Sequence, residues 1–199
     1  MAAPGPALAM LDVGDVPPAL LALDALAKEA MVELIGRGTI QPGRFAILFA
    51  GEVEAVERSY RKALPLCHAS VCDSVLLPHA EQRLVPAIRD GVMRWPAPGD
   101  TLGVIQLGFP PTLLRAVDAA LKGAHVDLVQ LRLGDGLGGR GIALLWGETH
   151  DVEAALELAE AAAFDGCADS LSTSIIRNAD DEVIAAFGDG TTFFKEWRG

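Results

Sequence analysis

The chain has 199 residues, a formal charge of −11 at pH 7 and 51% hydrophobic residues, which describes a folded globular protein and excludes a disordered one. Acidic residues outnumber basic ones by 27 to 16, and no local basic stripe offsets that excess, so we expect no nucleic-acid partner. No apolar run approaches the length of about 18 residues that a membrane helix needs. Residues 1–5 lack the basic region of a secretory signal, so we expect a cytoplasmic protein.

The first half of the chain predicts the order strand, helix, strand, strand, helix, strand, helix. Residues 8–13 form a short apolar run, and Pro17 then stands in the first turn of a helix, where its missing N–H costs no hydrogen bond. Leu20, Leu23 and Ala27 follow at spacings of three and four, which places an apolar stripe on one face of that helix. We expect this apolar face of the helix to pack against a sheet.

The remaining elements supply that sheet and a second helix. Two strands around a loop, a helix, a closing strand and a last helix are predicted at residues 32–37, 45–50, 53–60, 71–77 and 79–90, in that order. Two helices on one face of an antiparallel sheet, in β-α-β-β-α-β order, make a ferredoxin-like unit of the α+β class.

The second half of the chain repeats the first. Residues 7–34 align without a gap to residues 101–128, 94 positions later, and the offset becomes 96 where residues 44–57 align to residues 140–153. The identical pairs include Pro17 and Pro111, Ala22 and Ala116, Asp24 and Asp118, Lys28 and Lys122, Arg44 and Arg140, Leu48 and Leu144, and Gly51 and Gly147. The chain is therefore predicted to hold two copies of one domain.

The boundary between the copies is predicted at residues 93–100, because the prolines and glycine of this segment suit neither a helix nor a central strand. The first domain then covers residues 1–92 and the second covers residues 101–199. A weaker match aligns residues 77–80 with residues 176–179, at the end of each copy.

The stretches that recur in both copies resemble the tandem-domain shell proteins of bacterial microcompartments. The matching stretches are residues 8–13, the Asp-Ala-x-x-Lys runs at 24–28 and 118–122, Pro-Gly-Arg-Phe at 42–45, and the helix openings at 51–56 and 147–155. The resemblance covers nearly the whole chain. Each copy begins at its first strand, so the chain resembles the unpermuted type.

The resemblance implies two ferredoxin-like domains per chain and a homotrimer that forms a pseudohexameric ring. Such a protein is structural and not an enzyme: it tiles the facet of a shell in the bacterial cytoplasm beside other shell proteins, with encapsulated enzymes as possible partners, and its central pore conducts small metabolites. A trimer is also physically reasonable, because head-to-tail contacts between two unequal domain edges close into a ring after three chains.

A glycine-rich loop in the second copy has two interpretations from its residues. Residues 134–139 satisfy the G-x-G-x-x-G spacing of dinucleotide sites, but that motif opens a helix, whereas residues 141–146 predict a strand and hence a hairpin turn. The resemblance implies that this loop and its first-copy counterpart line the pore. The residues concerned are Thr39, Ile40, Gln41, Pro42, Gly43, Gly134, Asp135, Gly136, Leu137, Gly138 and Gly139.

The loop residues also predict what such a pore would admit. A ring of three Asp135 carboxylates would favour cations, whereas a ring of Gln41 would present only neutral amides. Some relatives carry a cysteine in the first-copy loop that holds an iron–sulfur cluster, and this chain has Gln41 in that stretch. We therefore expect no cofactor.

Neither a metal site nor a catalytic site is predicted. Cys67, His68 and Cys72 lie close in sequence but have no second ligand pair at zinc spacing, so these thiols are interpreted as buried and reduced. The four histidines are scattered and none belongs to a nucleophile motif.

Three basic residues are candidates for contacts at the edge of the shell tile. The resemblance places Lys28 and Lys122 at the rim, where neighbouring tiles meet, although a solvated lysine on an amphipathic helix would fit the same pattern. Arg177 matches the arginine of the family's Pro-Arg-Pro-His stretch, without either proline or the histidine.

The rival interpretation is a trimeric ferredoxin-like regulator that binds a small ligand or a nucleotide between subunits. A nucleotide site requires clustered basic residues, and only Arg44 and Arg140 flank the loops. An enzyme subunit that used the glycine loop for a cofactor would show a helix directly after Gly139.

Overall fold

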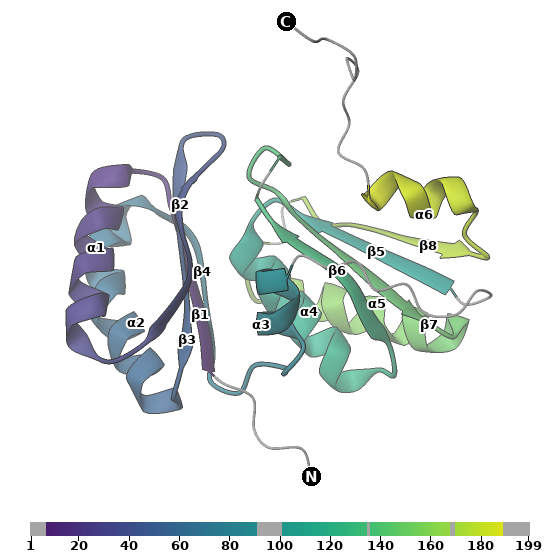
Figure 1. Cartoon of the computed structure of the whole chain (residues 1–199), viewed down its shortest axis with the longest axis horizontal. Coiled ribbons are helices and arrows are strands. Elements are labelled where there is room, and N and C mark those ends of the chain that lie inside the picture. Colours follow the sequence, from purple (N-terminus) through teal and green to yellow (C-terminus); the bar gives the residue numbers. More distant parts are fainter. Residues whose placement is uncertain (1–6, 91–100, 135, 168–169, 189–199) are drawn as a thin grey trace, which may run out of the picture.

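The computed structural model describes residues 7–90, 101–134, 136–167 and 170–188, which form two domains side by side (Figure 1). The first domain contains β1 (Ala7–Val13), α1 (Val16–Glu29), β2 (Glu33–Ile40), β3 (Arg44–Gly51), α2 (Val53–Cys67), a short 3₁₀ turn (His68–Ser70), β4 (Val71–Leu77) and α3 (Leu84–Asp90). The second contains β5 (Thr101–Leu107), α4 (Pro110–Gly123), β6 (Asp127–Leu133), β7 (Gly141–Gly147), α5 (Thr149–Ala163), β8 (Ser172–Arg177) and α6 (Asp181–Gly188). The linker predicted at 93–100 lies outside the described residues.

The two sheets have the same topology and the same register. Their strand orders are β2-β3-β1-β4 and β6-β7-β5-β8, antiparallel throughout. Val13 pairs with Phe45 in the first sheet, and Leu107 pairs with Gly141 in the second, which reproduces the offsets of 94 and 96 found in the sequence. The prediction of two tandem ferredoxin-like α+β domains is confirmed.

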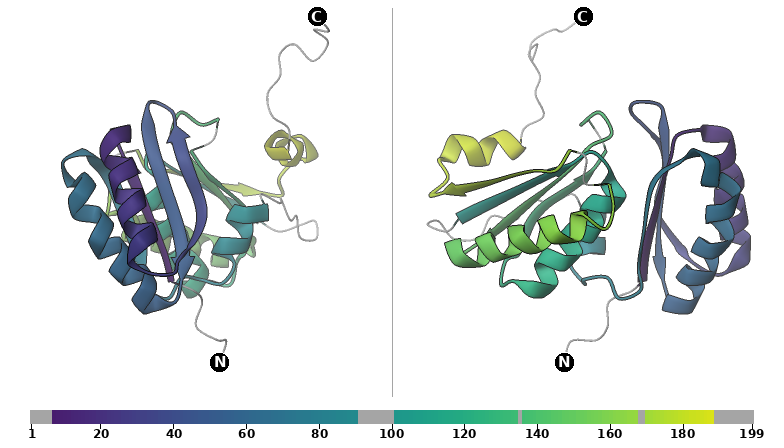
Figure 2. Two further views of the ribbon diagram at one scale, coloured as in Figure 1. Left: turned by 60° about the vertical axis from the view of Figure 1, so that its left-hand side comes forward. Right: turned by 180° about the vertical axis from the view of Figure 1, so that it is seen from behind.

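Each sheet is covered on one face by two helices of its own domain. Helices α1 and α2 lie on the face of the first sheet that points away from the second domain, and α4 and α5 cover the second sheet (Figures 1 and 2). Gly103 permits this packing in the second domain, because a Cβ there would lie 2.8 Å from Cγ1 of Val152 on α5.

The cores explain why the two domains form one body. One cluster belongs to the first domain alone and includes Leu11, Leu26 and Phe49, which are fully buried between the sheet and its helices. A larger cluster crosses between the domains and joins residues of β1 and β3 to the side chains of α4. The second face of the first sheet is therefore covered by the second domain.

The last helix of the first domain is shorter than predicted. The pattern predicts a helix over residues 79–90, but α3 begins at Leu84. The preceding residues are held by the second domain, since the backbone N–H of Glu81 donates to Asp118 Oδ1 over 2.7 Å. Helices α3 and α6 then take different courses: α3 packs against β6, whereas α6 places Val183 against Leu102 and Trp146 of its own sheet.

We expect Phe49→Ala to destabilise the protein by about 3–5 kcal/mol, because the ring is fully buried in the first-domain core and its removal leaves a cavity. Urea unfolding followed by circular dichroism measures the change. Leu66→Ala is the matched control, since the Leu66 side chain is exposed and its loss should cost less than about 0.5 kcal/mol. Equal losses in the two variants would contradict the core assignment.

Candidate functional site

The two hairpin loops that the sequence singles out lie against each other within one chain. The β2–β3 loop places Ile40 against Gly134, and the carbonyl oxygen of Gln41 and the guanidinium of Arg44 lie against Gly139. Gly134 and Gly139 have φ angles of 90° and 77°, a backbone conformation that glycine adopts without strain. A side chain at Gly139 would also collide with Gln41 and Arg44, so glycine allows this close approach.

Most of the predicted pore residues are accessible in a single chain. Those that are exposed are Thr39, Gln41, Pro42, Gly43, Gly136 and Gly138. Ile40 and Leu137 are half-buried, Gly134 and Gly139 are buried, and Asp135 lies outside the described residues. The strand β7 follows the glycine loop, so the loop turns a hairpin and does not open the helix that a dinucleotide site needs.

Arg44 connects the two loops to the sheet behind them. Its Nη2 donates to the carbonyl oxygen of Gly139 over 2.6 Å, and Nη1 lies 2.9 Å from Asp12 Oδ2. The guanidinium carbon stands 4.9 Å from the centre of the Phe109 ring, at the start of α4. One first-domain arginine thus binds a carboxylate of its own domain and both a carbonyl and an aromatic ring of the other domain.

The Asp12 carboxyl group is fully buried at this junction. Burial raises its pKa to about 6; the neighbouring Arg44 guanidinium acts to lower the pKa, and the Asp73 carboxylate raises it. Neither Asp12 oxygen has hydrogen-bond geometry to a donor among the described residues, so the ion pair with Arg44 is its main compensation. Burial, followed by the charge of Asp12, also raises the pKa of the Cys72 thiol.

A second part of the contact between the domains follows α4 along the edge strand β4. At the start of α4, Asp73 Oδ2 accepts hydrogen bonds from both the backbone N–H and the hydroxyl of Thr112, at 2.8 and 2.7 Å. At its end, Lys122 donates to the carbonyl oxygen of His79 and to Asp118, each over 2.6 Å. We call this set of α4–β4 contacts, together with Arg44, the seam.

Sequence reasoning found only part of the seam. It singled out Lys122 and noted Arg44 as a residue beside the loop. Nothing in the sequence marked Asp12, Asp73 or Thr112 as contact residues, because their partners are distant in the chain. Lys28 pairs with Asp24 on the exposed surface of α1, and Arg177 pairs with Glu153 of α5. Their contacts with neighbouring tiles stay predictions.

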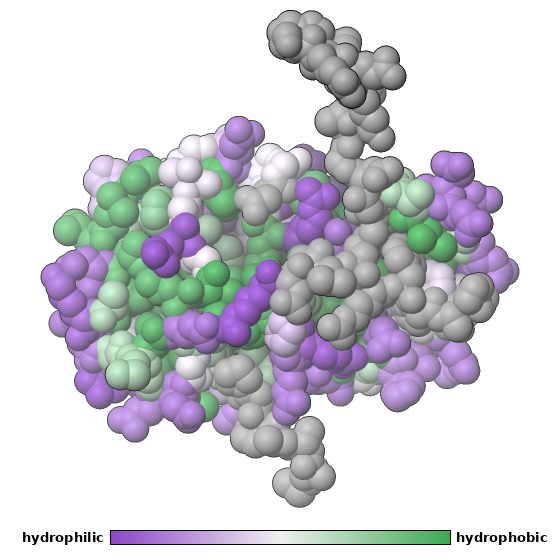
Figure 3. Space-filling view, in the orientation of Figure 1, coloured by the Kyte–Doolittle hydropathy of each residue, from purple (hydrophilic) through white to green (hydrophobic). Residues whose placement is uncertain are grey.

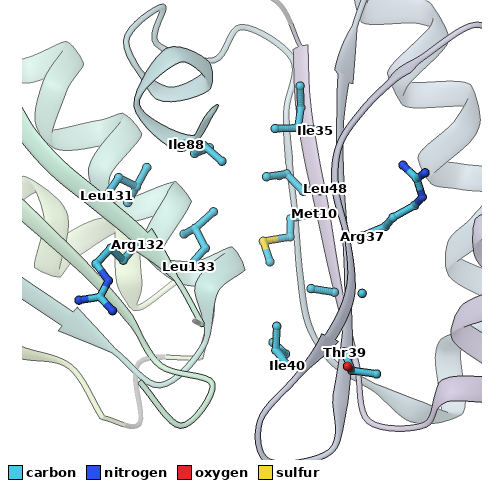
Figure 4. A pocket seen from close by; sticks show the side chains of 13 residues that line it. Met10, Ile35, Arg37, Thr39, Ile40, Leu48, Ile88, Leu131, Arg132 and Leu133 are labelled. Atoms are coloured by element: carbon cyan, nitrogen blue, oxygen red, sulfur yellow. The ribbon is translucent and has the colours of Figure 1, made fainter. Parts of the chain in front are cut away.

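Next to the loops, a cavity of about 410 Å³ separates the two domains. Figure 4 shows Met10, Ile35 and Leu48 of the first sheet facing Leu131 and Leu133 of β6 across it, while the side chains of Arg37 and Arg132 point away. The side chains that face each other across the cavity are apolar and both arginines point away from it, so the cavity lacks the convergent charged groups that a phosphate or nucleotide ligand requires.

The cysteines do not form a cluster with His68. Cys67 is buried at the end of α2, where its thiol lies near the carbonyl oxygens of Ala63 and Leu64, and burial raises its pKa. Among the described residues, one group has ligand atoms close enough for a metal ion, namely Glu148, His150 and Asp151, and it lies at the surface. Exposed acidic groups of this kind are common without a metal.

The comparison with known proteins agrees with the duplicated fold. The model of the BMC domain matches twice, at residues 7–80 and 101–179. The chain belongs to the BMC-domain family. It is a tandem-domain microcompartment shell protein, built from two copies of that domain.

Relatives and solved structures fall in the same family. The chain is 27% identical to the microcompartment shell protein PduT of Citrobacter freundii, over 79% of this chain and 84% of that protein. It is 34% identical to the carboxysome shell protein CsoS1 of Prochlorococcus marinus, over 44% of this chain and 87% of that one. A microcompartment protein of Desulfitobacterium hafniense superposes with a TM-score of 0.78 at 26% identity, over 91% of this chain and 99% of that one.

A fused permuted hexameric shell protein from the RMM microcompartment shares the fold, with a TM-score of 0.60 at 22% identity, over 80% of this chain and 82% of that one. In the present chain each domain begins at its first strand, β1 or β5, as the unpermuted type requires. No helix within the described ranges has both the length and the apolar character to cross a membrane.

The raised pKa of Asp12 predicts a specific pH dependence of stability. The native state binds a proton at Asp12 up to about pH 6, whereas the unfolded chain releases it near 3.8, so folding is weakened as pH rises between these values. Asp12→Asn removes this titration. We therefore expect the melting temperature of Asp12→Asn, relative to the wild type, to rise by a few degrees from pH 4 to pH 6 and then stay constant.

Thermal melts of both proteins in the same buffers from pH 4 to pH 8 measure that difference. A difference that does not vary with pH would show that the Asp12 pKa is not perturbed. A difference of opposite slope would show that the attraction of Arg44 outweighs burial.

Proposed function

We propose that three copies of this chain form a ring of six domains that tiles the facet of a microcompartment shell, and that the hairpin loops at its centre surround a pore for small metabolites. The single observation that carries the proposal is the seam. One chain contains one complete contact between a second-domain helix and a first-domain edge strand, and it leaves the two halves of an equivalent contact open.

The first open half is the outer face of α1. Leu20 and Leu21 are 49% and 64% exposed, although Leu114, the counterpart of Leu20 on α4, is fully buried. The prediction that Leu20, Leu23 and Ala27 form the stripe that covers the sheet is therefore wrong, because the buried residues of α1 are Ala19, Ala22 and Leu26. In Figure 3, apolar residues gather over the left-hand half of the surface, where the first domain lies. Leucines exposed on a helix whose repeat counterpart is buried support a partner at this face.

The second open half is the edge strand β8. Its counterpart β4 has Asp73 and Val75 buried beneath α4, whereas every residue of β8 is exposed or half-buried. The two open halves belong to opposite ends of the chain, with α1 on the far side of the first sheet and β8 in the second domain (Figure 1). A second copy that repeats the seam would place its α1 along β8, and three copies would close the ring.

Such a ring would bring all six hairpin loops to its centre, because the two loops of one chain already lie against each other. Lys28, Lys122 and Arg177 stand at the ends of α1, α4 and β8, so they would lie at the outer end of each seam, where the rim of the ring meets other shell proteins. Enzymes enclosed in the shell are possible partners. The role is structural and located in the cytoplasm. A nucleotide-binding regulator is less well supported, since both arginines beside the cavity point away from it.

We expect the wild type to sediment as a trimer at micromolar concentration and the double variant Leu20→Glu with Leu21→Glu to sediment as a monomer. Two buried carboxylates would oppose the contact along β8, while the exposed leucines contribute little to folding of the single chain. Leu66→Glu on α2 is the matched control and should remain trimeric. A monomeric wild type would overturn the proposed ring.

The pore is tested separately from the ring. Asp135→Lys would replace three negative charges by three positive charges at the axis, so we expect assembled shells to admit an anionic dye faster and a cationic dye more slowly. Glu54→Lys on α2 makes the same change of charge outside the loops and should leave both rates unchanged. Equal dye entry in Asp135→Lys and wild-type shells would show that Asp135 does not line the constriction.

A further inference from the structure

The two arginines that follow the hairpin loops occupy equivalent positions but have different surroundings. Arg44 comes just before β3 residue Phe45, and Arg140 comes just before β7 residue Gly141, and Phe45 and Gly141 pair with equivalent residues of the central strands. The Arg44 side chain is 11% exposed, and both of its terminal nitrogens make contacts in the seam. The Arg140 side chain is exposed and forms no ion pair with any residue the structure describes.

The repeat identifies what would surround Arg140 at an equivalent seam. Behind Arg44 lies Asp12, which pairs with Ala46, and its counterpart Gln106 pairs with Ile142 in the same register. Behind Arg140 there is therefore a neutral amide in place of a carboxylate. Among the residues that the structure describes, Arg140 therefore has no carboxylate partner on its own domain.

A carboxylate is present instead on the domain that would lie opposite Arg140. Ahead of Arg44 lies the ring of Phe109, the residue that precedes α4. The residue that precedes α1 in the same way is Asp15. At a seam between two copies, Arg140 of one copy would face Asp15 of the next copy, where Arg44 faces Phe109 within the chain.

We propose that Arg140 forms an ion pair with Asp15 of a second copy of this chain, and that this ion pair sets the order of domains around the ring. The inference rests on the proposed trimer and adds to it the residues that recognise the second copy. Asp15 is exposed, and its side-chain carboxylate accepts a hydrogen bond from the hydroxyl of Ser70 over 2.7 Å and from no other described residue. Its carboxylate therefore remains accessible to a partner.

The polar contacts at the end of α4 have matching residues on α1, which supports the register. Within the chain, Lys122 binds the carbonyl oxygen of His79, and Asp118 binds the backbone N–H of Glu81. Their counterparts on α1 are Lys28 and Asp24. These would meet the backbone of residues 178 and 180 of the neighbouring copy. The contact between Asp73 and Thr112 is not repeated, because the counterparts are Ser172 and Pro18, and Pro18 has neither an N–H nor a hydroxyl group to donate.

The change of partner discriminates between right and wrong neighbours. Two first domains side by side would surround Arg44 with both Asp12 and Asp15, an excess of buried negative charge. Two second domains would leave Arg140 between Gln106 and Phe109 without any carboxylate. Only alternation of first and second domains gives each arginine one carboxylate, so the ion pair favours a ring of alternating domains.

The test is a double-mutant cycle on trimer dissociation, with Asp15→Asn and Arg140→Gln as the single variants. Asparagine still suits the position before a helix, so these neutral changes preserve folding. Sedimentation over a dilution series should show each single variant dissociating at a concentration about tenfold higher than the wild type. The double variant should be no worse than either single variant, because the second change removes nothing further.

A charge exchange provides the second arm. Asp15→Arg alone and Arg140→Asp alone should both dissociate more readily than the neutral variants, and their combination should restore most of the trimer. Glu54→Gln on α2 is the control for a change of charge outside the seam. Additive losses in the double-mutant cycle, or no recovery on exchange, would overturn the ion pair.

The outcomes separate this inference from the ring itself. If the wild type is monomeric, both the proposed ring and the proposed ion pair are wrong. If the wild type is trimeric and both neutral variants dissociate like Glu54→Gln, the ring stands and the ion pair is wrong.

Discussion

The packing of α4 along β4 is the contact on which the rest of the architecture depends. Leu113, Leu114 and Val117 are fully buried there and in the adjoining core, and each buried aliphatic side chain contributes about 1.5–3 kcal/mol. Because the helix is held at one end by Asp73 and at the other by His79, the contact also sets the direction of the second domain. That direction brings the two hairpin loops together around Gly139.

Most of the fold is readable from local patterns in the sequence. The strand predicted at residues 71–77 is present with those bounds, and the second helix begins at Val53 as predicted, because alternation and helical spacing report short-range burial. The start of α3 was predicted five residues early. Its true start depends on Glu81 being bound by Asp118 of the other domain, which no local pattern records.

The sequence predicted those residues of the candidate site that belong to a recognisable pattern of neighbouring residues. The loops were identified by their glycines and by the resemblance, and Arg44 and Arg140 by the repeat. Asp12 was not, because a buried acid within an apolar strand is recognisable only when the arginine that faces it is known. The difference between Asp15 and Phe109 has no meaning until the structure shows that Arg44 stacks on the latter.

In a duplicated domain, similar surfaces form one contact within the chain and another between copies of the chain. Within the chain, the two domains are covalently joined, so their effective concentration is high and the seam tolerates the desolvated carboxylate of Asp12. Between copies, association must overcome the loss of translational freedom, and a buried acid on one surface would weaken it. A carboxylate at Asp15, on the opposite and exposed surface, gives that surface a charge opposite to that of Arg140 and stays hydrated while the chain is alone.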